Sequence, residues 1–149
     1  MASTVAAFTH LARTHPDHGP ALFELANALD ADGQEALAER HYRQALDLGI
    51  TGDRQRRCVV QLASTLTELG KPDDVLLLLV DVGAEHPEWA EVGVFRAIAE
   101  HRAGRPNTAV AQLLSVITEH NGNQDLDRYR AAWREAVSAI QSSEHDSVE

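Results

Sequence analysis

The sequence predicts an all-α protein built from repeated helical hairpins. Residues 62–70, LASTLTELG, nearly repeat residues 25–33, LANALDADG, and the shared leucine, alanine and glycine positions lie 37 residues apart. Only 5% of the residues are aromatic, so leucine, alanine and valine must fill the core, which favours closely packed helices over sheets. Because one helical hairpin cannot bury its apolar stripe alone, stacked copies of the same pattern are expected.

Within each copy the apolar residues recur at helical spacing, as Leu62, Ala63, Leu66 and Leu69 illustrate. Glycine then closes the helix, since it readily adopts the left-handed conformation found just after a helix C-terminus. Pro72 suits the first turn of the helix that follows. These signals predict eight helices, at about 3–14, 19–32, 34–48, 53–69, 72–85, 88–103, 106–120 and 125–141.

Polar residues precede two of these helices at positions typical of an N-cap. Asp17 or His18 precedes the second helix and Asp53 the fourth. The polar tail 142–149 is predicted to be disordered.

A third copy follows at a shorter spacing, because GRPNTAV echoes GKPDDV at a separation of 34 residues. In this copy Arg96 and Glu100 replace two leucines of the second copy. Two interpretations are open. The register slips by one residue, or the helix at 88–103 is rotated and its core stripe is Val92, Phe95 and Ala99.

The phrases FELANALDADG, VVQLASTLTELG and YRAAW resemble tetratricopeptide repeats, and more specifically a bacterial group of compact repeat proteins of the group 5 type. The resemblance covers roughly residues 18–140. It implies a right-handed α–α superhelix of about three hairpins, preceded by an N-terminal helix. The repeats would span about 19–50, 53–87 and 88–120, with a capping helix at 125–141, all in one domain over 1–141.

The same resemblance implies a protein–protein interaction scaffold that holds a peptide or helix of another protein in a concave groove. The first helix of each hairpin would line that groove. The implied groove residues are Phe23, Asn27, Asp30, Arg57, Val60, Gln61, Ser64, Glu68 and His101. The alternative is that these side chains form only the solvated face of amphipathic helices.

Clamping of a C-terminal carboxylate, which some tetratricopeptide domains perform, is disfavoured. Asn27 matches one clamp asparagine, but Gln61 replaces the other. Basic residues are also missing, because Phe23, Glu91 and Phe95 occupy their positions.

A second surface is suggested by the apolar run VLLLLVDV at 75–82. The helix at 72–85 should bury one side of this run, leaving Leu77, Leu78 and Val80 on the other side. Either a neighbouring helix covers these three side chains, or they form an exposed apolar patch. In the second case the chain is a self-associating scaffold, and a homodimer is expected.

Composition excludes several other classes of function. The net charge of −10 disfavours a nucleic-acid partner, which requires a positive field. The longest apolar run is far too short to span a membrane. The N-terminus has no signal-peptide pattern, and Cys58 is the only cysteine, so we expect a cytoplasmic protein in a reducing compartment.

The residue pattern also argues against metal binding and catalysis. His10, His15 and His18 do not share a helix face, and no cysteine or carboxylate cluster completes a zinc site. Cys58 has basic neighbours at a helix start, but no base accompanies it, so a buried structural thiol is the expected state. No nucleophile or phosphate-binding motif is present. We therefore expect no metal, no cofactor and no enzymatic activity.

Overall fold

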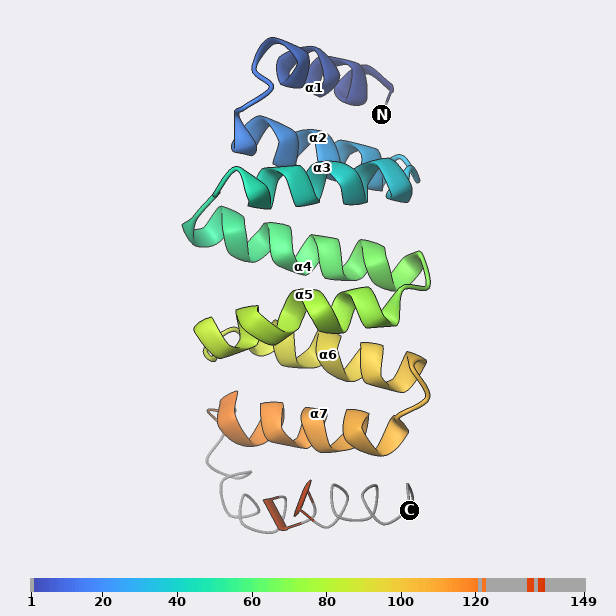
Figure 1. Ribbon diagram of the computed structural model, residues 1–149, viewed down its shortest axis with the longest axis vertical. Coiled ribbons are helices and arrows are strands. Elements are labelled where there is room, and N and C mark those ends of the chain that lie inside the picture. Colours follow the sequence, from blue (N-terminus) through green and yellow to red (C-terminus); the bar gives the residue numbers. More distant parts are fainter. Residues whose placement is uncertain (1, 121, 123–133, 136, 139–149) are drawn as a thin grey trace. The chain divides into compact units, whose positions relative to one another are not determined.

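The computed structural model describes residues 2–120, 122, 134–135 and 137–138 (Figure 1). This part of the chain is helical, with no strand. Its helices are α1 (Ala2–Thr14), α2 (Gly19–Ala31), α3 (Glu35–Asp47), α4 (Gly52–Glu68), α5 (Pro72–Glu85), α6 (Ala90–Arg102) and α7 (Pro106–His120). The all-α prediction is confirmed, and each of these seven helices ends within two residues of its predicted bounds. The predicted capping helix at 125–141 and the tail 142–149 lie outside the described residues, apart from the helical residues 134–135 and 137–138.

The chain falls into two compact units, one from Met1 to Lys71 and the other beginning at Pro72. In the first unit α1 packs on α2, α2 on α3, and α3 on α4, while α2 also touches α4. In the second unit α5 packs on α6 and α6 on α7. Within each unit this neighbour-to-neighbour packing fits a tetratricopeptide-type superhelix. A single domain over 1–141 stays a prediction.

The glycine turns follow the sequence prediction. Gly33, Gly70 and Gly104 have φ angles of 74°, 69° and 80°, in the left-handed region that favours glycine. At the first of these turns the N–H of Gln34 donates to the carbonyl of Leu29 at 2.9 Å, so the turn closes the last carbonyls of α2. The same bonding recurs at the other two turns. Pro72 and Pro106 then begin α5 and α7, as predicted.

The two predicted caps have different outcomes. His18 is the N-cap of α2, because its Nδ1 accepts a hydrogen bond from the backbone N–H of Ala21 at 3.2 Å. Asp53 is not a cap. Helix α4 begins one residue earlier, at Gly52, with Thr51 in the N-cap position, so Asp53 lies in the first turn of the helix.

The change of period from 37 to 34 residues has a simple structural cause. Helix α4 has 17 residues, whereas its counterpart α6 has 13. The additional turn at the start of α4 adds four residues to the first period (17 against 13), and α5 adds one residue to the second (14 against 13), so the two periods differ by three residues. The exposed side chains of Asp53 and Arg54 occupy this additional turn.

Helix α6 keeps the register of α4 at the 34-residue spacing. Val92, Ala97 and Ala99 are buried, at the positions of three buried residues of α4. Val92 and Ala99 were expected in the core stripe of a rotated helix, and Phe95 was expected with them. Phe95 is only half-buried, and Ala97 takes the core position instead.

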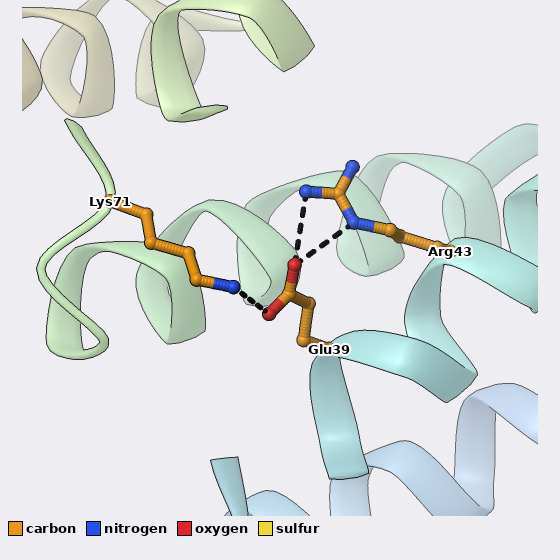
Figure 2. A network of polar contacts seen from close by, with 3 residues as sticks. All are labelled: Glu39, Arg43 and Lys71. Atoms are coloured by element: carbon orange, nitrogen blue, oxygen red, sulfur yellow. Dashed lines mark hydrogen bonds and ion pairs between the residues drawn. The ribbon is translucent and has the colours of Figure 1, made fainter. Parts of the chain in front are cut away.

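A three-residue ionic network ties the α4–α5 turn to α3 (Figure 2). Lys71 Nζ lies 2.7 Å from Glu39 Oε2, and Arg43 Nη2 lies 3.1 Å from Glu39 Oε1. Burial acts to raise the pKa of Glu39, but hydrogen bonds and charges from Lys71 and Arg43 outweigh it. The pKa of Glu39 is therefore held below its usual value.

This network predicts a pH-dependent contribution to stability. Because the folded-state pKa of Glu39 is depressed, its contribution is present above the unfolded-state pKa and is lost as the pH falls through the folded-state value. We expect Glu39→Gln to lower the free energy of unfolding by about 1 kcal/mol at pH 7. The difference should vanish in acid, as measured by urea denaturation followed by far-UV circular dichroism. The control is Glu68→Gln, which changes an exposed glutamate and should have little effect on the free energy of unfolding. If Glu39→Gln lowered that free energy equally at pH 7 and in acid, the ionic role of Glu39 would be contradicted.

Candidate functional site

Tyr42 of α3 connects three helices of the first unit. Its side chain is completely buried, and its hydroxyl donates a hydrogen bond to Asn27 Oδ1 of α2 at 2.9 Å. Its backbone carbonyl accepts a hydrogen bond from Cys58 Sγ of α4 at 3.5 Å. Its ring lies 6.1 Å from the ring of Phe23, centroid to centroid. A buried phenol needs such a hydrogen-bond acceptor, so this contact fixes α2 against α3.

Two contacts place α2 beside α4. The guanidinium carbon of Arg57 lies 5.6 Å from the centroid of the Phe23 ring, which is within the range of a cation–π interaction. Farther along both helices, the Thr65 hydroxyl lies 3.1 Å from Asp30 Oδ1. Both pairs advance in the same direction along the chain, so α2 and α4 run parallel.

The Thr65 hydroxyl has one proton to donate and two acceptors within hydrogen-bond distance. Besides Asp30, it lies 2.9 Å from the backbone carbonyl of Gln61. Burial raises the pKa of Asp30, and the hydrogen bond from Thr65 opposes that rise. The pKa of Tyr42 is also raised, first by burial and then by the nearby charge of Asp30, so its hydroxyl remains a donor at neutral pH.

The predicted groove residues of the first unit divide into two layers. Phe23, Asn27 and Asp30 form a supporting layer, because Phe23 is fully buried and the polar groups of the other two bind residues of this unit. We call the exposed or half-buried layer on α4 the α4 stripe. It consists of Arg57, Val60, Gln61, Ser64 and Glu68.

Phe23 and Asn27 therefore do not act as free groove contacts. The Phe23 side chain has 0% of its surface exposed and serves as the platform for Arg57. The Asn27 side chain contacts both Tyr42 and Glu24, the latter at 3.5 Å. The family resemblance implied that both side chains contact a ligand. In the structure they instead pack beneath the exposed α4 stripe and support it.

His101 lies in the second unit, where it is exposed near the end of α6. Leu77 and Val80 of α5 are exposed at 74% and 51%, while Leu78 is half-buried. Of the three side chains considered for an exposed apolar patch, two are therefore exposed. On the opposite side of α5, Val75 and Leu79 are buried as predicted, whereas Leu76 and Val82, which were expected to be buried with them, are half-buried.

Cys58 has the environment of a structural thiol. It is fully buried, and burial raises its pKa to about 12. A catalytic thiol requires the opposite shift, because the thiolate is the nucleophile. The basic residues beside it in the sequence do not reverse the effect of burial.

Among the described residues, no group of three His, Cys, Asp or Glu side chains is arranged to hold a metal ion. No helix within these same residues is both long and apolar enough to cross a membrane.

Comparison with known families matched residues 19–140 to the TPR_5 family, described as “Tetratrico peptide repeat”. The chain belongs to the tetratricopeptide repeat family. The match begins at the first residue of α2, so α1 precedes the family's repeats. No curated protein and no solved structure matched the chain.

Membership agrees with the helical hairpins and glycine turns described above. Tetratricopeptide repeat proteins typically bind other proteins and are generally scaffolds rather than enzymes. The resemblance read from the sequence is thereby confirmed at the level of the family.

Sequence reasoning missed Thr65 and the Glu39 network. Thr65 interrupts an otherwise apolar stripe in LASTLTELG, and that interruption was the available signal for a buried polar contact. Arg43, four residues after Glu39, was a local signal for a helical ion pair. Lys71 gave no comparable signal, because it lies 32 residues away in the chain.

Proposed function

We propose that this tetratricopeptide repeat protein binds a segment of another protein along the α4 stripe and the edge of α2. The observation that supports this is Arg57, which lies over the Phe23 ring with an exposed side chain. Within the described part of the chain Arg57 forms no ion pair, so its guanidinium donors are available to a ligand. A cation that is held in place by a ring loses little side-chain freedom on binding.

The charges of the stripe suggest the polarity of the partner segment. Arg57 lies at one end and the exposed Glu68 at the other, with the polar Gln61 and Ser64 between them. Eleven residues of α-helix span about 16 Å. An extended peptide of about five residues, or three turns of helix, covers that length. We infer that such a segment carries an acidic residue near Arg57 and a basic residue near Glu68.

The packing of α2 and α4 favours a preformed surface. Tyr42, Phe23 and Asp30 fix the supporting layer before any ligand arrives. A preorganised surface costs less conformational entropy on binding, which favours recognition of short segments.

Charge reversal on the stripe tests this proposal. The double variant Arg57→Glu/Gln61→Glu should reduce capture of a partner by at least tenfold in affinity purification, because both changes repel an acidic side chain. The variant should keep its helical content, since both side chains are exposed. Arg40→Glu on α3 is the matched control, with an exposed arginine changed in the same way. Equal capture by the stripe variant and the control would contradict the proposal.

We propose homodimerisation through α5 as a second candidate function. The supporting observation is the exposure of Leu77 and Val80, which lie three residues apart on one face of the helix. Leaving large aliphatic side chains in water forgoes about 25 cal/mol for each Å² that could be buried. A second copy presenting the same face would cover both side chains.

Light scattering over a concentration series tests self-association. We expect a mass near twice the 16.3 kDa of the chain. Leu77→Glu/Val80→Glu should return the mass to that of one chain, because a charged face cannot be buried without a partner. Leu37→Glu, which changes an exposed leucine of α3, is the control and should leave the mass unchanged. A single-chain mass at all concentrations would exclude the dimer.

A further inference from the structure

Arg96 occupies a core position of the repeat. The position 34 residues earlier is Leu62, which is fully buried in the first unit. Arg96 is half-buried on α6, and it forms no hydrogen bond or ion pair within the part of the chain that the structure describes. A guanidinium that replaces a core leucine and lacks a partner needs either water or a ligand to satisfy its donors.

A pocket of about 140 Å³ lies around this side chain. It is an open pocket lined by α5, by the loop between α5 and α6, and by α6 and α7, so it lies wholly within the second unit. The rings of His86 and Trp89 stack at 3.9 Å, with an angle of 3° between their planes, and line the pocket at the loop. A cavity of about this volume holds a molecule the size of benzene.

Two glycines line the pocket. Gly83 lies beside the guanidinium, because a Cβ atom there would be in ordinary van der Waals contact with Arg96 Nη1 at 3.6 Å. A Cβ atom on Gly93 would collide with Val116 Cγ2, so glycine lets α7 pack directly on α6. The same Cβ atom would lie 3.3 Å from Gln112 Nε2, which shows how close the Gln112 amide comes to α6.

The donors at the pocket suit a carboxylate. Arg96 provides a planar fork of N–H groups, and Gln112 provides an amide N–H₂. Gln112, like Arg96, forms no hydrogen bond to another described residue. Arginine binds carboxylates through two parallel hydrogen bonds, and a neighbouring amide can donate a third.

One acidic residue also lines the pocket. Glu119 is exposed on α7 and makes no ion pair with Arg96. Its negative charge opposes an incoming anion without satisfying the guanidinium. The pocket therefore has one unpaired cation and one competing carboxylate at its surface.

We propose that this pocket, which we call the Arg96 pocket, binds a carboxylate group. The carboxylate comes either from an acidic side chain of a protein partner or from a small free dicarboxylate. The two sources share the same chemistry and differ in what is attached to the carboxylate. The site is separate from the α4 stripe, so failure of either proposal leaves the other standing.

Nuclear magnetic resonance on the ¹⁵N-labelled full chain tests the proposal. Sodium succinate and N-acetyl-glutamate α-amide are titrated while the arginine Nε–Hε and tryptophan indole signals are followed. We expect saturable shifts of the Arg96 and Trp89 signals. Tighter binding of the glutamate compound identifies a partner's side chain, and tighter binding of succinate identifies a free dicarboxylate.

Three variants at the pocket and one control variant outside it make the result specific. Arg96→Leu, which restores the residue of the preceding repeat, should fold and weaken binding at least tenfold. Arg96→Lys keeps the positive charge but lacks the planar pair of N–H groups, so its affinity for the carboxylate should lie between those of the wild type and Arg96→Leu. Glu119→Gln should tighten binding, because it removes the competing charge. Arg105→Leu is the matched control outside the pocket and should bind as the wild type does.

Several results would contradict the proposal. Shifts that do not saturate, that are reproduced by sodium chloride at equal ionic strength, or that persist in Arg96→Leu would overturn the carboxylate site. The pocket would then hold water only. Shifts of the same size with the neutral analogue succinamide would also overturn the proposal, because they would not depend on a carboxylate.

Discussion

The hydrogen bond from the Tyr42 hydroxyl to Asn27 is the contact on which the first unit depends. A buried phenol without an acceptor costs about 1–3 kcal/mol, so the sequence must provide an acceptor at one place on α2. That requirement fixes α2 against α3. The Tyr42 ring then supports Phe23, and Phe23 supports Arg57 of α4. The position of the exposed α4 stripe thus depends on Tyr42, a buried residue of the preceding helix.

The second unit uses the same helical hairpin with different side chains. Where the first unit buries Leu62, the second carries Arg96, and where α4 has Val59, α6 has Gly93. Gly93 allows α7 to pack closely on α6. Arg96 places a charged side chain at a position where the first unit buries the apolar side chain of Leu62. A repeat fold tolerates such changes because each copy contacts only its neighbours. Variation of core positions between copies can therefore create a site without altering the hairpin.

The sequence predicted most of the fold because the signals were local. Glycine at the left-handed position and proline in the first turn fixed the bounds of α5 and α7, and the apolar period located the other helices. The site was predicted less completely. Phe23 and Asn27 were predicted to line a groove, but Phe23 is buried against Tyr42 and Asn27 is hydrogen-bonded to it, although Tyr42 lies fifteen residues or more away in the chain. Contacts at such separations leave no periodic trace in one sequence. Asp53 failed as a cap because α4 begins one residue earlier than predicted, at Gly52, with Thr51 in the N-cap position.

The most direct measurement is a double-mutant cycle on Tyr42→Phe and Asn27→Ala, read by native-state hydrogen exchange of the amides in α2 and α4. Hydrogen exchange reports local opening, so the first unit is measured separately from the second. We expect the two changes to be non-additive, with a coupling free energy of about 0.5–1.5 kcal/mol and faster opening of both helices. Additive effects within about 0.3 kcal/mol, or protection of α4 that is unchanged in Tyr42→Phe, would show that the α4 stripe does not depend on this hydrogen bond.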